Sequence, residues 1–148
     1  MAIYYSDNAT KTRPAVYPDE AGKVLVSDGT YEITAAQNVD EVVVALCVLP
    51  AGCIPIDFTV AVDDLESTTS LVWNGGGIKT TLDDVDQIYI SASQVGRAAA
   101  GIARATLFPI VAPLADATFF GIHVTDLTTG TAGTIRGILT YRATEYGV

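Results

Sequence analysis

Histidine and cysteine, whose side chains often carry out acid–base or nucleophilic chemistry, are scarce in this chain. It has one histidine, His123, and two cysteines, Cys47 and Cys53. A Ser-His-Asp triad needs a single histidine, but no serine of the sequence lies in a segment that resembles a nucleophile elbow. One histidine and two cysteines also cannot fill an ordinary four-ligand zinc site without carboxylates. We therefore expect a protein that is not an enzyme, with no catalytic residues, no metal site and no cofactor.

Two stretches resemble ligand-binding loops but lack the required spacing. Segment 74–81 (NGGGIKTT) has glycines ahead of a lysine, but Ile78 intervenes, whereas a phosphate loop needs glycine directly before its lysine. The acidic cluster 82–87 (LDDVDQ) that follows would repel a phosphate. That cluster and the pair Asp63-Asp64 could also suggest calcium, but the central glycine and closing glutamate of an EF-hand are missing. We interpret 74–81 as a mobile surface loop and the acidic residues as solvated, with a cation held between chains as the alternative.

The composition predicts a globular chain and argues against several partners. A length of 148 residues fits one domain, and 49% of the residues are apolar while 17% are charged. The net charge of −9 opposes binding to nucleic acid, which depends on neutralising phosphates. No apolar run approaches the roughly 20 residues of a membrane span, so no membrane partner is expected. The polar N-terminus lacks the apolar core of a signal peptide, so we expect synthesis in a cytoplasm.

Short strands are predicted from residue 23 onward. Segment 23–35 contains two apolar stretches around Asp28-Gly29, a dipeptide typical of hairpin turns, and predicts two short strands. Segment 42–49 is apolar at every position, which indicates a strand covered on both faces.

A turn and an alternating strand follow. Segment 49–52 (LPAG) suits a type I turn that begins at the leucine. Beyond it, apolar and other residues alternate with a period of two, so one face of this strand should be buried. The residues predicted to point inward are Ile56, Phe58, Val60 and Val62.

Cys47 and Cys53 lie symmetrically about Pro50. If the turn joins two strands of a hairpin, a register that places the cysteines opposite each other would permit a disulfide. Free, buried thiols are favoured because the sequence carries no secretion signal.

The last third combines one predicted helix with two predicted strands. Segment 92–102 has apolar residues at helical spacing and predicts a helix that Ser91 or Ser93 could cap. Segments 117–125 and 134–144 alternate as strands do, and the Thr/Gly-rich loop between them is of the hairpin kind. In the first of these strands His123 points away from the apolar face, so we expect it to be partly exposed.

These elements predict an all-β fold. Many short strands favour an antiparallel β-sandwich, jelly-roll-like, that forms one domain over residues 22–148. Residues 1–21 are predicted to form an extended N-terminal arm, because Pro14 and Pro18 favour extended backbone before them. The arm is too apolar for a solvated tail, so it is expected to lie either on its own domain or on a partner.

The order of these segments resembles a family of small virion proteins of tailed bacteriophages, which includes capsid decoration, cement and minor structural proteins. The similarity rests on the opening 1–11 (MAIYYSDNATK), the strand 23–33, the apolar segment 42–60 with its Leu-Pro-Ala-Gly turn, and the closing segment 119–144. The turn and the opening are its most specific parts.

The resemblance implies a structural protein that binds the outside of a bacteriophage head. Such proteins typically form homotrimers at threefold positions and cement neighbouring subunits of the major capsid protein. The implied location is the outer surface of the virion. The predicted arm would supply the reach to a capsid or neighbouring subunit. Its residues that we expect at this interface are Ile3, Tyr4, Tyr5, Lys11, Arg13, Val16 and Tyr17.

Two other functions compete with this interpretation. A tail-associated or host-recognition β-domain would bind a surface glycan, and Trp73 beside the glycine-rich 74–77 is the obvious aromatic candidate. A tryptophan at such a strand end is more typical of a core. A small enzyme on a β-scaffold would have to use His123.

Overall fold

Two β-sheets make up the regular structure of the protein. The computed structural model describes residues 2–7, 9–10 and 23–143, and every regular element in these ranges is a strand. The strands are β1 (Ile3–Tyr5), β2 (Val24–Ile33), β3 (Val43–Leu49), β4 (Cys53–Val62), β5 (Val72–Ile78), β6 (Val85–Ser93), β7 (Gly101–Arg104), β8 (Thr118–Asp126) and β9 (Gly133–Ala143). Within the described ranges no helix is long and apolar enough to cross a membrane.

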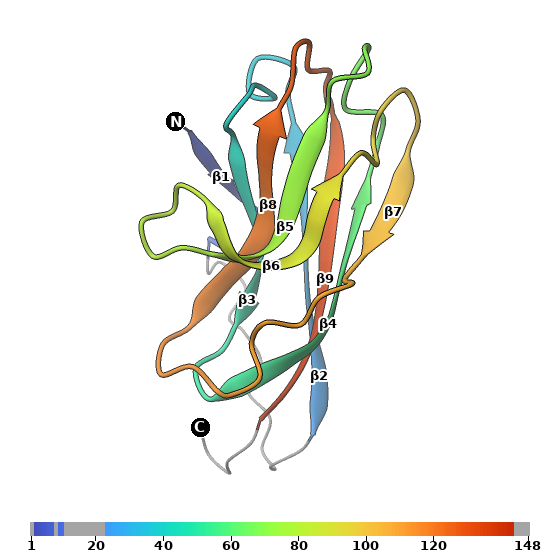
Figure 1. Ribbon diagram of the computed structural model, residues 1–148. Helices are drawn as coiled ribbons and strands as arrows, with labels where there is room; N and C mark the ends of the chain where they lie inside the picture. The colour runs from blue at the N-terminus through green and yellow to red at the C-terminus, as the bar shows by residue number, and fades with distance from the viewer. Residues whose placement is uncertain (1, 8, 11–22, 144–148) are drawn as a thin grey trace.

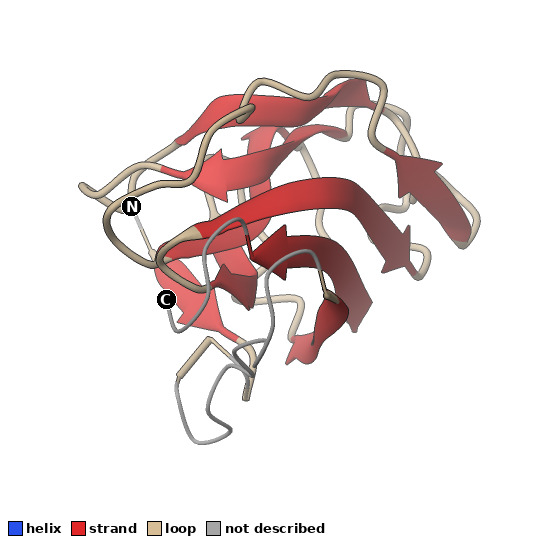
Figure 2. Cartoon of the chain, turned by 90° about the horizontal axis from the view of Figure 1, so that it is seen from below, coloured by secondary structure: helices blue, strands red, loops and turns tan. Residues whose placement is uncertain are grey.

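The sheets pack against each other as a sandwich (Figure 1). One has the strand order β1-β3-β8-β5-β6 and the other the order β2-β9-β4-β7. The pairing of β1 with β3 is parallel, and the other strand pairs are antiparallel. Figure 2 shows the same strands from below, joined by loops and turns. The prediction of an all-β antiparallel sandwich is confirmed, and the jelly-roll detail stays an interpretation.

Strand β3 is buried along its whole length, as its apolar sequence predicts. All seven residues from Val43 to Leu49 are buried. One side of the strand faces the main core between the sheets, to which Val44 and Leu46 belong. Val43 and Ala45 belong to a second cluster, which other parts of the same chain complete. Double coverage of this strand therefore needs no second molecule.

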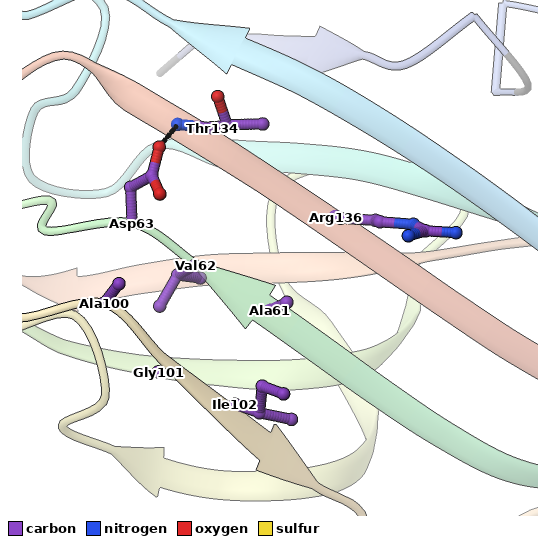
Figure 3. A pocket seen from close by; sticks show the side chains of 8 residues that line it. All are labelled: Ala61, Val62, Asp63, Ala100, Gly101, Ile102, Thr134 and Arg136. Atoms are coloured by element: carbon purple, nitrogen blue, oxygen red, sulfur yellow. Dashed lines mark hydrogen bonds between the residues drawn. The ribbon is translucent and has the colours of Figure 1, made fainter.

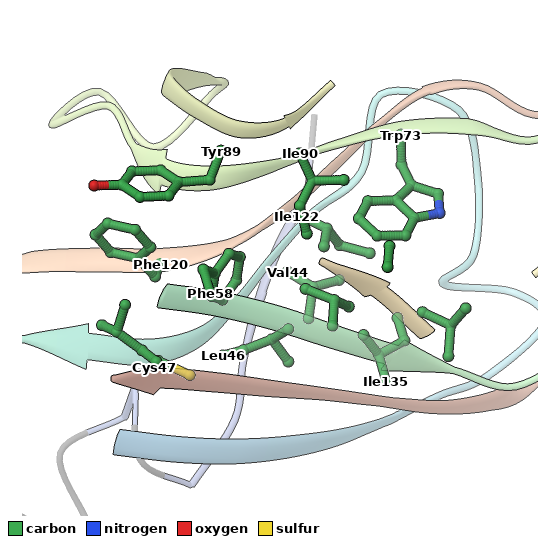
Figure 4. Packing of buried hydrophobic residues seen from close by; sticks show 14 of the residues in the cluster. Val44, Leu46, Cys47, Phe58, Trp73, Tyr89, Ile90, Phe120, Ile122 and Ile135 are labelled. Carbon is green, nitrogen blue, oxygen red and sulfur yellow. The ribbon is translucent and has the colours of Figure 1, made fainter. Parts of the chain in front are cut away.

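The core between the sheets is built on aromatic and branched side chains (Figure 4). Phe120 of β8 makes edge contacts with Phe58 of β4 and Tyr89 of β6, at ring-centroid distances of 5.4 and 5.3 Å. Trp73 is fully buried, and its indole Nε1–H donates to the carbonyl of Val95 over 2.9 Å. The glycan-binding alternative therefore loses its aromatic candidate, because Trp73 is a core residue.

Strand β4 follows the predicted alternation except at one residue. Phe58, Val60 and Val62 are buried as expected, but Ile56 is 39% exposed. The register with β9 shifts between Pro55 and Asp57, so Ile56 is the extra residue of a β-bulge. A bulge changes the side of the sheet on which the following residues point, so the inward set resumes at Phe58.

The turn before β4 lies one residue later than predicted and joins the two sheets. The N–H of Cys53 donates to the carbonyl of Pro50 over 3.3 Å, and Gly52 has a φ of 76°. A positive φ at the third position is the mark of a type II turn, not of the predicted type I. Because β3 and β4 belong to different sheets, the turn is not a hairpin that would set Cys47 opposite Cys53.

The hairpin predicted at Asp28-Gly29 does not form. Strand β2 runs without a break from Val24 to Ile33 and pairs residue by residue with β9. A Cβ atom at Gly29 would lie well inside contact distance of the backbone carbonyl of Leu46. The glycine therefore serves a close approach between the sheets and does not form a turn.

The helix predicted over 92–102 is also absent. The segment holds the end of β6, a turn, and the start of β7. Ala92, Gly96 and Ala98 have φ values of 47°, 99° and 52°. Such left-handed backbone interrupts an α-helix, so the segment forms an irregular connection although its apolar residues have helical spacing.

Segment 74–81 is largely strand, not a mobile loop. Gly75, Gly76 and Gly77 lie in β5 and are buried. A Cβ atom at Gly76, where φ is 151°, would clash with the backbone of Gln87 in β6. Glycine is needed here because irregular pairing brings the two strands unusually close.

Strand β9 confirms its predicted alternation, whereas the predicted hairpin before it is wrong. Ile135, Leu139, Tyr141 and Ala143 are all buried. However, β8 belongs to the five-stranded sheet and β9 to the four-stranded sheet, so the loop between them crosses from one layer to the other.

Candidate functional site

The first residues of the predicted arm form a strand of the sandwich itself. Ile3, Tyr4 and Tyr5 make up β1, which pairs with Val43 to Ala45 of β3. The ring of Tyr4 stacks on Tyr31 with a centroid distance of 5.7 Å. The ring of Tyr5 meets the edge of Phe119 at 5.5 Å. For these three residues, half-buried in the chain alone, the structure places the contact on their own domain.

The other predicted interface residues fall outside the described part of the chain. These are Lys11, Arg13, Val16 and Tyr17. The predicted boundary between arm and domain at residues 21 and 22 also lies there. Their contact with a capsid, and that boundary, stay predictions.

Ser6 fastens β1 to the middle of β3. Its side chain is buried, and its hydroxyl donates to the carbonyl of Leu46. The N–H of Ser6 donates to the carbonyl of Ala45 over 2.8 Å, and the N–H of Ala9 donates back to the serine hydroxyl over 3.2 Å. Leu46 sits at the irregularity in the pairing of β3 with β8. The Ser6 hydroxyl therefore donates to a carbonyl that lies at the bulge, outside the regular hydrogen-bond pattern of the sheet.

Strand β1 occupies one edge of the five-stranded sheet. Its second edge pairs with no strand among the described residues. Edge strands can accept an added strand from another chain, with backbone hydrogen bonds supplying the affinity. The N-terminal strand is thus a possible contact even though its side chains pack on their own domain.

His123 is buried, contrary to the prediction of partial exposure. It retains 5% of its accessible surface. Nδ1 lies 2.8 Å from a carboxylate oxygen of Asp84, and Nε2 lies 3.1 Å from one of Glu41. Asp84 in the loop between β5 and β6 and Glu41 in the loop before β3 thus cover this outward position of β8. With carboxylates at both ring nitrogens, His123 is not arranged to take a proton from a serine.

Asp84 belongs to a small charged network rather than to a solvated loop. Its carboxylate contacts His123 and also the ammonium of Lys79, at 3.2 Å. Burial alone would raise the pKa of Asp84, but hydrogen bonds from His123, from Lys79 and from the N–H of Val85 lower it overall. The network joins β8 to the loop between β5 and β6, so its role is structural.

A second buried carboxylate organises the loop between β4 and β5. Glu66 has no exposed surface. Its oxygens accept hydrogen bonds from the hydroxyls of Thr68 and Ser70, and from the N–H groups of Ser70 and Leu71 at 3.0 and 2.6 Å. Burial acts to raise the pKa of Glu66, but these hydrogen bonds lower it to about 2. Glu66 is therefore an anion that holds the loop segment from Glu66 to Leu71 in one conformation.

A shallow hollow lies on the outside of the four-stranded sheet (Figure 3). It has a volume of about 410 Å³ and is lined by residues of β4, β7 and β9 with their flanking loops. Ala61 and Ile102 pair across β4 and β7 in its floor. Asp63 at its border accepts a hydrogen bond from the N–H of Thr134 over 2.9 Å. The lining is mainly apolar, and its charged residues are Asp63 and Arg136.

Cys47 and Cys53 are free and buried, as favoured by the sequence. Burial, reinforced by the negative charge of Asp28, raises the pKa of the Cys47 thiol to about 12. Burial also raises the pKa of Cys53. We predict that neither thiol reacts with a thiol reagent such as Ellman's reagent in the native protein at pH 8, and that both react in denaturant. Rapid reaction of either thiol without denaturant would contradict the structure.

No protein-family model and no curated protein matches the chain. Two solved structures resemble it over nearly its whole length. A chain from the capsid of Ralstonia phage GP4 is 29% identical with a TM-score of 0.78, and the match covers 96% of this chain and 98% of that one. A chain from the capsid asymmetric unit of cyanophage Pam1 is 26% identical with a TM-score of 0.60, and here the coverage is 92% and 96%.

Both matching chains come from phage capsids. The chain is similar to these phage capsid proteins over nearly its whole length. The likeness supports a structural role in the virion and association with other capsid proteins. The resemblance inferred from the Leu-Pro-Ala-Gly turn and the N-terminal opening is confirmed at this level. A rigid sandwich whose segments are held by buried hydrogen bonds, such as those of Ser6 and Glu66, is suited to a structural role in a capsid.

Proposed function

We propose that the protein binds the outside of a bacteriophage head and cements neighbouring subunits of the major capsid protein. The observation that carries this proposal is the match to a chain of the GP4 capsid, because it covers almost all of both chains. A cementing protein needs a stiff body and contact surfaces rather than a reaction centre. In this proposal the protein acts as a homotrimer on the outer surface of the virion.

The N-terminal segment is proposed as one contact with the capsid or with a neighbouring subunit. Ile3, Tyr4 and Tyr5 stand at a sheet edge, where a partner strand could add to β1. Lys11 and Arg13 are two of only eight basic residues in the whole chain. Placed just beyond this edge in sequence, they could pair with carboxylates of a partner.

A binding assay with empty capsid shells tests the proposal. The shells are built from the major capsid protein of the phage that encodes the chain, and they lack the chain itself. The full chain is expected to cosediment with the shells at saturating, near-stoichiometric levels and to raise their dissociation temperature. Sedimentation of the shells without the chain would contradict the cementing function, and binding to purified tails instead would favour the host-recognition alternative.

Charge substitutions test the N-terminal contact in the same assay. Deleting residues 2–17 would also remove β1 and the Ser6 hydrogen bonds, so substitutions are the cleaner change. We expect Lys11→Gln combined with Arg13→Gln to weaken binding to shells about tenfold. Lys79→Gln is the matched control, because Lys79 pairs with Asp84 of its own chain and its loss should leave binding unchanged. Equal binding by all three proteins would remove residues 11 and 13 from the interface.

A further inference from the structure

The outward face of the four-stranded sheet has no covering layer among the described residues. Along β2, β4, β7 and β9, buried positions alternate with exposed ones, so one side faces the core and the other faces solvent. We call this second side the outer face. It carries large apolar side chains: Val24 and Val26 of β2 are 54% and 55% exposed, and Ile102 of β7 is 62% exposed. Val24 and Val26 lie on one edge strand of the sheet and Ile102 on the opposite edge strand. Exposed large apolar side chains at both edges of one face indicate an interaction surface.

The outer face is also electrically distinct from the rest of the molecule. Its charged residues are three arginines, Arg104, Arg136 and Arg142, and three carboxylates, Asp28, Glu32 and Asp57. These charges cancel, whereas the whole chain carries −9. All the net negative charge therefore lies elsewhere. A protein partner with carboxylates on its surface meets least repulsion when it approaches this face.

Two of the three arginines are free to bind a partner. Arg136 forms an ion pair with Asp28 at 3.2 Å. Arg104 and Arg142 are exposed and form no ion pair with a carboxylate among the described residues. In the register of β7, β4 and β9, Arg104 and Arg142 are separated by two strands across the sheet and by four residues along the strands. Their Cα atoms are therefore roughly 16 Å apart. Arginine is enriched at protein interfaces because its planar fork binds carboxylates in a bidentate manner.

The size of the outer face matches a specific interface. Four strands at about 4.8 Å spacing and up to about ten residues long give a face of roughly 500–600 Å². Contact over this area would bury about 1,000 Å² in total, which is at the lower limit for a specific protein–protein interface. The strands that carry the face are fixed by paired backbones, so little conformational entropy is lost on binding.

We propose that the outer face docks on a surface of a neighbouring capsid shell protein that is apolar opposite the two edge strands, β2 and β7, and carries carboxylates opposite Arg104 and Arg142. The inference rests on the proposed function, because that function supplies a shell as the partner. Val24 and Val26 bury against one of these apolar areas and Ile102 against the other, and the two arginines fix the orientation. The acidic remainder of the molecule, with its net −9, then faces solvent.

Single substitutions by aspartate test the apolar part of the outer face. Val26→Asp and Ile102→Asp place a carboxylate on the outer face, and each is expected to weaken binding to capsid shells at least about tenfold. Val39→Asp is the matched control, because Val39 is 47% exposed in the loop between β2 and β3, away from the outer face. It should bind within about twofold of the unmodified chain. Circular dichroism and the melting temperature of each variant establish that it is folded.

Charge substitutions test the arginines. Arg104→Glu combined with Arg142→Glu should also weaken binding at least about tenfold, and the affinity of the unmodified chain should fall with added salt more steeply than that of the double variant. Undiminished binding by the folded double variant and by Ile102→Asp, or an equal loss in Val39→Asp, would overturn the inference. A loss of self-association in these variants, with binding to shells intact, would overturn it too, because the face would then join copies of the chain. If the unmodified chain itself does not bind shells, the proposed function fails first.

Discussion

Replacing Gly121 with alanine is expected to lower the free energy of unfolding by at least about 3 kcal/mol and the melting temperature by about 10 °C. Gly121 lies in the middle of β8, between Ala45 of β3 and Gly76 of β5. A Cβ atom there would lie well inside contact distance of the carbonyl oxygen of Val44. That oxygen belongs to the backbone of a fully buried strand and cannot move aside without breaking the ladder. Urea denaturation followed by tryptophan fluorescence measures the loss.

Gly75→Ala is the matched control for this substitution. Gly75 is also buried in the five-stranded sheet, but its Cβ would meet only side chains, with Trp73 at 3.3 Å and Ile90 at 3.4 Å. We expect a change of no more than about 1 kcal/mol, because side chains can shift by a few tenths of an ångström. Equal stabilities of the two variants would mean that β3 and β8 are not packed as described.

The second large effect is expected at Glu66. Replacing it with glutamine should lower the free energy of unfolding at pH 7 by roughly 2 to 3 kcal/mol. The four groups around the carboxylate all donate hydrogen bonds, and they belong to Thr68, Ser70 and Leu71. Glutamine keeps the shape, but its amide nitrogen is a donor that would face other donors. Denaturation curves at pH 7 for the variant and the unmodified chain give the difference.

The same residue predicts how stability depends on pH. The pKa of Glu66 is lowered to about 2 in the folded protein from an ordinary value near 4.5. A lowered pKa means that the folded state binds the proton less tightly than the unfolded state does. The stabilisation is therefore complete above about pH 5 and is lost as the pH falls toward 2. In Glu66→Gln this part of the acid dependence should be missing.

Glu32→Gln serves as the control for the Glu66 experiment. Glu32 is exposed on β2, where a surface carboxylate contributes little to stability, so we expect a change within about 0.5 kcal/mol. If Glu66→Gln were as stable as Glu32→Gln and kept the full acid dependence, the hydrogen-bond network described for the loop before β5 would be wrong.

The strand pattern could be predicted where burial alone decides it. The all-apolar β3 and the alternating β9 are each specified by their own residues, so the prediction holds for both. The strand prediction fails where a glycine is required by close packing between strands. Gly29 and Gly76 look like turn or loop residues in the sequence, but they lie in strands where another backbone approaches too closely for a Cβ atom.

The surfaces proposed for function depend on contacts that are distant in sequence. His123 meets Glu41 across 82 positions and Asp84 across 39, so no local pattern indicates that it is buried. The outer face likewise combines β2, β4, β7 and β9, which become neighbours only through the order of the sheet. The signal that could have suggested it was the number of arginines in the last third of an acidic chain. Their positions on one face required the strand pairing.

The proposed cementing function requires many copies of this chain in a virion. Quantitative mass spectrometry of purified particles gives the number of copies relative to the major capsid protein. A cementing protein on the outer surface of the head predicts a near-stoichiometric ratio, with hundreds of copies in each particle. A handful of copies per particle would contradict this function and indicate a tail or a single vertex, and absence from the particles would contradict a virion role altogether.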